Sequence, residues 1–560
     1  MRLGAVTVNS GADLVICDEI NAATFTQANG GGTTTIGGPL NTSAAGGIGL
    51  NGNIFAINDT VTTTGDGTFT LTNAGQLIIA GGGDLNLDGA FLQNGAGAVQ
   101  SAGDIDTSND GITFQSAVTL AGNVAFSTNT GNGDILFNST LDAQNAGVED
   151  INLSAGTGTV TFNDAVGAGV RAGAITINGA AGVTAVSTID ADSITITNGG
   201  AVDLNGAVDT TGEFNSSSTN FDNSGASITT NDNDLIIACE DNLTLGALLN
   251  AGAGALQIWA GSNGDGALTL GGGLVITSDD LSFQAGNGNG PDTTASIDLV
   301  SNAPTFLGAA GLGTSPRSFT LQQDAAITDA DIPVVEQFGD GIDDITYTLQ
   351  SDDMTVTVGA NVKLAHSKLN LTGADGVTVN GALSLNSLSI SADNDTDGTG
   401  NVTISQAINT NGGLFSSLGV NLDNTGGTIN TGGGDLTINH TGATVLAAAV
   451  SSGAGDIDID TTGTLNVNST INTTSGDLTL DSDDAMTFNT DGDITTTIGN
   501  VNVGANRDGV LSTAGDVTTA NGNITFTKAV TLTGPVAAQP PSTAPSTPAP
   551  TTSPFRDQLI

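Results

Sequence analysis

The chain has 560 residues, and its 57 Asp and Glu against 8 Lys and Arg give a formal net charge of −49 at pH 7. Nucleic-acid binding needs clustered Lys and Arg that displace counterions from phosphates, so this balance excludes nucleic acid as an expected partner. No apolar run reaches the roughly 20 residues that a transmembrane helix needs. Hydrophobic residues make up 38% of the chain, carried by Val, Ile, Leu and Ala, which predicts a core of thin aliphatic side chains.

A turn followed by a short alternating strand recurs along the chain. It reads Gly-Asp-Leu-Asn-Leu at 83–87 and Gly-Asp-Leu-Thr-Leu at 476–480. Apolar residues at alternate positions place one face of each strand inward, and the preceding Gly, Asn or Asp tolerates the backbone of a tight turn. No segment of useful length has the helical period. The sequence therefore predicts an all-β protein.

The strands recur with a short period. Asp435, Asp456 and Asp477 are spaced 21 residues apart. A β-sandwich needs about 100 residues to close, whereas a period near 20 is typical of one coil of a solenoid. We therefore expect a parallel β-helix, or β-solenoid, with coils of about 20 residues. Its coils should stack the apolar residue that follows each Asp, namely Leu436, Ile457 and Leu478.

The sequence also contains a longer repeat, in addition to the short period. Phe221–Gly225 (FDNSG) matches Leu422–Gly426 (LDNTG) at an offset of 201 residues. Proline-rich stretches interrupt the pattern and cannot contribute ladder hydrogen bonds. The expected organisation is a solenoid with the first long repeat and the start of the second at 1–303, an irregular proline-containing junction at 304–338, a solenoid continuation at 339–534, and a disordered Pro/Ser/Thr-rich tail at 535–560.

The Gly-Asp-[Ile/Leu]-Thr-[Ile/Leu] strands, with segments such as Leu153–Asn163 (LSAGTGTVTFN), resemble the central repeats of filamentous-haemagglutinin-like bacterial adhesins. The resemblance covers about Asp13 to Leu532. It implies a right-handed parallel β-helix, an extracellular or cell-surface location, and a role in attachment, aggregation or biofilm matrix formation. It also implies surface glycans or other matrix components as partners.

The two ends of the chain lead to further expectations. Open strand edges at both ends of a solenoid predict self-association. Met1–Ile20 has one Arg and lacks the apolar segment of a signal peptide. The chain is therefore expected to be a fragment of a longer exported protein.

Two other functions remain open. A structural stalk or surface-layer spacer would have the same fold but would bind neither cells nor glycans. A polysaccharide-degrading β-helix would use paired carboxylates, together with basic or aromatic groups that hold the sugar. Trp259 and Tyr347 stand alone in the sequence, and His366 and His440 are expected to be solvent-facing strand residues. We therefore assign no catalytic residue and no cofactor-binding residue.

One acidic motif predicts a metal site. Asp393, Asp395 and Asp397 alternate and are followed by Gly398, as in the first half of a calcium loop. The twelfth position is Ile404 where an EF-hand has Glu, so the motif is not an EF-hand. The alternative is a solvated acidic turn. The cluster at 340–344 (DGIDD) is a weaker candidate for the same ion.

The stacked acidic turns raise a general question. Carboxylates about 5 Å apart in water repel by about 0.8 kcal/mol per pair. Hydrogen bonds from backbone N–H groups would offset this repulsion, and so would bound calcium. The sequence leaves both explanations open.

Overall fold

The computed structural model of the chain is all-β in the part that it describes. That part contains no helix long and apolar enough to cross a lipid bilayer. It comprises residues 3–263, 266–271, 274–278, 280–286, 297–298, 305–307, 318–329, 346–352, 354–359, 368–504 and 509–534.

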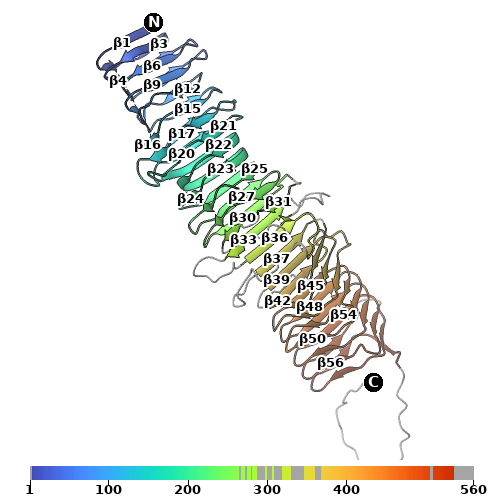
Figure 1. The fold of residues 1–560 in the computed structure, drawn as a ribbon. Helices are drawn as coiled ribbons and strands as arrows, with labels where there is room; N and C mark the ends of the chain where they lie inside the picture. The colour runs from blue at the N-terminus through green and yellow to red at the C-terminus, as the bar shows by residue number, and fades with distance from the viewer. Residues whose placement is uncertain are drawn as a thin grey trace, which may run out of the picture. The chain divides into compact units, whose positions relative to one another are not determined.

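The chain is divided into two compact units. The first consists of Met1–Gly286 with Ser301–Pro316, and the second of Asn287–Val300 with Arg317–Ile560. Each is a stack of coils whose strands pair in parallel with strands of the next coil (Figure 1). The predicted β-solenoid is confirmed, with about 22 coils of about 21 residues each.

Each coil of the first unit contributes strands to three parallel faces. Between two adjacent coils, Leu85 pairs with Ile105 on one face and Phe91 with Ile112 on another. A third face is formed by β2 (Leu14–Ile16), β4 (Thr33–Ile36), β7 (Ile54–Ile57), β10 (Leu77–Ile79), β13 (Val99–Ser101), β16 (Val118–Leu120) and β19 (Leu141–Ala143).

The second unit also has three faces. The first consists of β36 (Ser318–Gln323), β37 (Thr346–Ser351), β39 (Lys368–Gly373), β42 (Ser387–Ser391), β45 (Phe415–Gly419), β48 (Leu436–His440), β51 (Ile457–Thr461), β54 (Leu478–Ser482), β57 (Val501–Val503) and β60 (Ile524–Phe526). The second consists of β38 (Thr355–Val358), β40 (Gly376–Val379), β43 (Asn401–Ile404), β46 (Leu422–Asp423), β49 (Thr444–Leu446), β52 (Leu465–Val467), β55 (Met486–Phe488), β58 (Leu511–Thr513) and β61 (Val530–Leu532). The third consists of β41 (Leu383–Ser384), β44 (Ile408–Asn409), β47 (Ile429–Asn430), β50 (Val450–Gly453), β53 (Ile471–Thr473), β56 (Ile494–Thr496) and β59 (Val517–Thr519).

The register in the second unit is the one that the 21-residue period predicts. Leu436 pairs with Ile457, and Ile457 pairs with Leu478. Coil length varies because residues are added in the turns: Leu369 and its partner Leu388 are 19 residues apart, whereas Leu388 and Phe415 are 27 apart. The long coil contains the loop with the acidic motif.

The core contains more aromatic side chains than expected. In the first unit, five buried phenylalanines stack through successive coils, with neighbouring ring centroids 5.1–5.7 Å apart. Such pairs add to the hydrophobic gain from burial. The prediction of a thin aliphatic core is therefore wrong for this unit. Each coil contributes a single Phe to this column, and the rings come into contact only when the coils stack, so the sequence does not reveal an aromatic cluster. The five are Phe69, Phe91, Phe114, Phe137 and Phe162.

The predicted junction at 304–338 is only partly described. Its described residues include β35 (Thr305–Leu307), which pairs with β32 (Val275–Thr277), and β36, which pairs with β37. The rest of the junction and the predicted tail at 535–560 lie outside the described residues.

The long repeat corresponds to equivalent positions in the fold. Asn223 and Asn424, one in each copy, are both fully buried. The amide of Asn223 accepts from the N–H of Gly246, and that of Asn424 accepts from the N–H of Ala447. Each asparagine thus satisfies backbone groups of the next coil, which would otherwise be buried without a partner.

A glycine lies at the corner before each first-face strand of the last coils. In one such corner, Gly476 donates its N–H to the buried hydroxyl of Thr473 over 3.0 Å. A Cβ added to Gly476 would overlap the carbonyl oxygen of Gly455, one coil earlier. The backbone of adjacent coils is therefore in contact at this corner, and only glycine fits.

The first unit offers a matched test of this contact. A Cβ at Gly97 would overlap the backbone of Gly75, whereas a Cβ at Gly49 would meet nothing within 4 Å. We expect Gly97→Ala to lower the free energy of unfolding by about 1–3 kcal/mol, the usual effect of overpacking, and Gly49→Ala to change it little. Urea denaturation followed by circular dichroism measures both. Equal stability of the two variants would contradict the proposed steric role.

Candidate functional site

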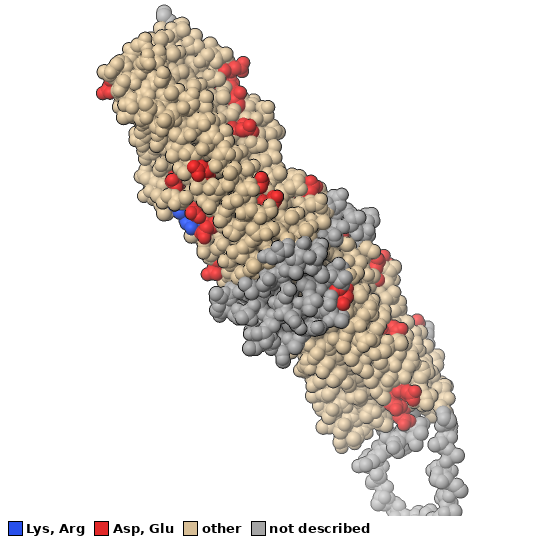
Figure 2. Space-filling view, viewed as in Figure 1, with Lys and Arg blue, Asp and Glu red and all other residues tan. Residues whose placement is uncertain are grey.

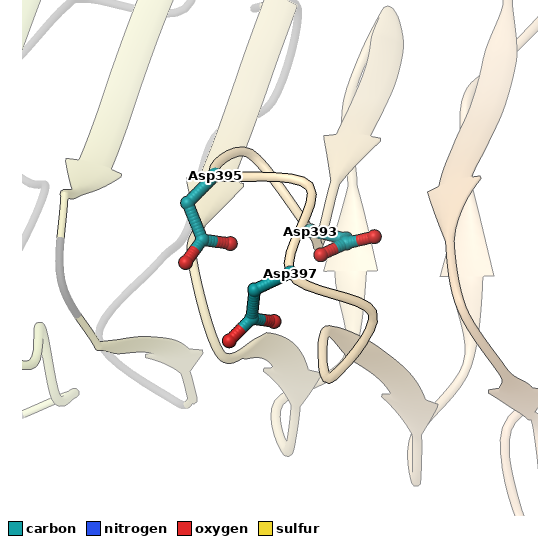
Figure 3. A group of neighbouring side chains, drawn as sticks. All are labelled: Asp393, Asp395 and Asp397. Carbon is teal, nitrogen blue, oxygen red and sulfur yellow. The ribbon is translucent and has the colours of Figure 1, made fainter.

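The acidic motif lies in the loop between β42 and β43. Figure 3 shows the side chains of Asp393, Asp395 and Asp397 extending from this one loop. Asp393 is half-buried and the other two are exposed, and one carboxylate oxygen from each lies within 4.8 Å of those from the other two. The structure therefore brings together the three residues that the sequence predicted as metal ligands.

Hydrogen bonds within the loop hold two of the three carboxylates. The N–H of Gly398 donates to Asp393 Oδ1 over 3.1 Å, and the N–H of Thr399 donates to Asp397 Oδ1 over 2.9 Å. The chain turns sharply here, since Thr396 has φ of 59° and Gly398 has φ of 88°. These contacts are those of an acidic turn, and they leave further carboxylate lone pairs for a ligand.

The residues around the acidic loop determine which other groups could act as metal ligands. Ile404, at the twelfth position, is a buried residue of β43 and cannot supply a ligand. The hydroxyl of Thr399 lies 3.3 Å from Asp375 Oδ1, so a fourth carboxylate from the preceding coil approaches the loop. Asp375 is not recognisable from the sequence as part of this site, because only the inter-coil register connects it with the motif. The weaker candidate at 340–344 lies outside the described residues.

The stacked acidic turns are satisfied by backbone hydrogen bonds. Asp435 Oδ1 accepts from the N–H of Asp456 over 3.0 Å, and Asp456 Oδ1 accepts from the N–H of Asp477 over 2.8 Å. Asp477 in turn accepts from the N–H of Asn500 over 2.7 Å. Hydrogen bonds to charged acceptors are among the stronger ones. The sequence left open whether backbone N–H groups or bound calcium offset the repulsion between these carboxylates. The backbone hydrogen bonds are present in the structure.

Like charges also meet on the outer surface of the first face. Asp460 of β51 lies in register with Asp481 of β54. Partial burial and the neighbouring carboxylates, Asp481 first among them, raise the pKa values of both Asp458 and Asp460. The local field on this face is therefore strongly negative. Figure 2 shows acidic side chains scattered over the visible surface.

His440 is buried, contrary to the sequence-based expectation. It ends β48 at a position that alternates with Leu436 and Ile438, so its side chain is directed inward with theirs. Its Nε2 lies 3.0 Å from the hydroxyl oxygen of Ser417, and both residues are fully buried. Burial lowers the pKa of His440 to about 4, so the imidazole is neutral at pH 7. His366 lies outside the described residues.

The Ser417–His440 pair does not make a catalytic site. A nucleophilic serine needs a hydrogen-bonded base and room for a substrate, and here both side chains have no exposed surface. The hydrogen bond instead satisfies two polar groups in the core.

The two isolated aromatic residues are placed differently. Tyr347 is buried in β37, 6.0 Å from the ring of Phe319. Trp259 of β30 (Ala255–Ala260) is half-buried, and its Nε1 donates to the carbonyl of Gly286 over 2.6 Å. The buried ring of Tyr347 offers no surface to a sugar.

The buried histidine predicts a pH dependence. Because the folded pKa is about 4 and the unfolded value is about 6.5, the unfolded state binds a proton first as the pH falls. The free energy of unfolding should therefore fall by about 2–3 kcal/mol between pH 6.5 and pH 4 through this group. His440→Gln should remove this part of the loss, as measured by urea denaturation at a series of pH values. An unchanged pH profile in the variant would contradict the buried, neutral state.

Comparison with known proteins gives no further assignment. No family model, curated protein or solved structure matches this chain.

Proposed function

We propose that the chain is a non-enzymatic, extracellular adhesin-type segment of a bacterial cell surface that mediates attachment, aggregation or matrix formation. The observation that carries this proposal is the parallel β-solenoid, whose outer faces repeat short polar side chains at one-coil intervals. On β48, β51 and β54, for example, Thr437, Asp458 and Thr479 follow one another in register. Such a surface offers many equivalent weak contacts, which together can give strong attachment.

The alternative is a structural stalk or surface-layer spacer, which would need the same solenoid but no ligand. A polysaccharide-degrading enzyme is a weaker alternative. Parallel β-helices can support such chemistry, but function depends on the site and not on the fold. The only histidine in the described residues is fully buried, so it cannot contact a sugar.

Binding of the purified chain separates these alternatives. We expect the fluorescently labelled chain to bind bacterial or host cells in a saturable way, because an adhesin must recognise a surface component. The control is the same chain after thermal unfolding. Absence of saturable binding to cells, glycans and matrix proteins would favour the stalk, whereas release of new reducing ends from polysaccharides would favour the enzyme.

Calcium at Asp393, Asp395 and Asp397 is part of the proposal. Carboxylate oxygens are the ligands that calcium prefers, and the three groups converge within one loop. The resemblance to adhesins suggests an extracellular setting, where calcium is abundant and weak sites with Kd of about 0.1–1 mM are useful.

Paired substitutions test this site. We expect the double variant Asp395→Asn, Asp397→Asn to lose calcium binding in isothermal titration calorimetry, because two of the three charged ligands are gone. The matched control is Asp435→Asn with Asp456→Asn, which removes the same charge from turns whose carboxylates accept backbone N–H groups. If both double variants bind calcium equally well, the loop is only an acidic turn.

A further inference from the structure

A concavity of about 610 Å³ lies on the first unit, across its first four coils. It is lined mainly by asparagines and glycines at the ends of β1 (Leu3–Ser10), β3 (Ile20–Gly30) and β6 (Ile48–Gly52). Its side-chain amides belong to Asn9, Asn29, Asn51 and Asn53.

The amides of this concavity differ from several other stacked asparagines of the protein. Elsewhere, asparagines of adjacent coils bond to one another: Asn163 donates to Asn138 over 2.7 Å, and Asn178 donates to Asn152 over 2.9 Å. Asn9 and Asn29 are also paired in register on adjacent strands. In the described residues, however, the four amides of the concavity have no hydrogen-bond partner within the protein, so their donors and acceptors are free for a ligand.

Glycines keep the floor of the concavity bare. A Cβ on Gly31 would lie 2.7 Å from the carbonyl oxygen of Gly11, and one on Gly52 would lie 3.1 Å from that of Gly30. The first distance is too short for any side chain, and the second leaves almost no room. All four glycines line the concavity. Backbone contact between coils therefore favours glycine at these lining positions.

The chemical groups that line the concavity limit the kinds of ligand that it could bind. The residues that line the concavity carry no charge, and an anionic ligand would be repelled by a chain with a net charge of −49. The strands β3 and β6 each pair with a strand on either side, β6 with β9 (Phe69–Asn73), so an added peptide strand would find few free backbone groups along them. Amides that both donate and accept suit hydroxyl groups.

We propose that this concavity binds a neutral polysaccharide, with the chain of the sugar following the stacked amides from coil to coil. The amides of adjacent coils are spaced by about 4.8 Å, the distance between neighbouring strands. Successive sugar residues can thus each contact one coil. This inference rests on the proposed function and gives it a ligand class and a place on the molecule.

The test uses the full chain and defined sugars. Isothermal titration calorimetry is performed with cellohexaose, maltohexaose and chitohexaose, and with polygalacturonate as the anionic comparison. We expect at least one neutral hexasaccharide to bind and polygalacturonate not to bind. The double variant Asn29→Ala, Asn51→Ala should weaken that binding by about tenfold or more, the loss of one or two good hydrogen bonds. The exposed asparagine variant Asn163→Ala, with circular dichroism as the check on folding, should bind as the unchanged chain does.

Three outcomes would overturn the inference. The first is that no neutral hexasaccharide binds, and the second is that binding is unaffected by Asn29→Ala, Asn51→Ala. The third is that a Gly/Asn-rich peptide binds in place of every sugar. Cell binding by the same variants separates this result from the proposed function: cell binding that survives loss of the amides leaves the adhesin proposal standing, whereas a chain that binds neither cells nor sugars contradicts both.

Discussion

Parallel backbone pairing holds each residue about 4.8 Å from its equivalent in the next coil, and the rest of the structure depends on this spacing. Because the repeat is short, residues of the same kind come to lie over one another. Leu436, Ile457 and Leu478 form an apolar column in this way, and five phenylalanines form another. A single coil cannot bury its own apolar face, so stability depends on both neighbours.

The same spacing also brings like-charged and polar groups of adjacent coils close together. Hydrogen bonds within and between neighbouring coils compensate for this. Acidic turns accept the N–H of the next coil, as Asp435 does from Asp456, and buried corner residues such as Thr473 accept from the N–H of a glycine. Asp460 and Asp481 lie in register on the outer face, and the pKa of Asp460 is raised by partial burial and, next, by the neighbouring carboxylate of Asp481. Backbone hydrogen bonds thus limit repulsion within a chain of high negative charge.

The two features that could bind a ligand lie where a loop interrupts the regular stack or where side-chain amides have no hydrogen-bond partner in the described part of the protein. The acidic loop at Asp393–Asp397 occupies a coil of 27 residues between Leu388 and Phe415, because the turns accept insertions that the strands do not. The amides of Asn29 and Asn51 line a concavity with a glycine floor. The acidic loop lies outside the ladder and can vary without loss of the fold, whereas Asn29 and Asn51 lie on strands that pair with their neighbours.

The sequence by itself determined the strand pattern, the coil period, the register of Leu436 over Ile457 and the convergence of Asp393, Asp395 and Asp397, because each follows from local alternation or from one repeated spacing. The alternation of His440 with Leu436 and Ile438 also indicates its burial, so the prediction that it faces solvent was wrong. Only the tertiary structure decided that Asp375 approaches Thr399, that turn carboxylates accept N–H groups of the next coil, and that separate phenylalanines stack. These contacts join residues of different coils, and unequal coil lengths hide their register from the sequence.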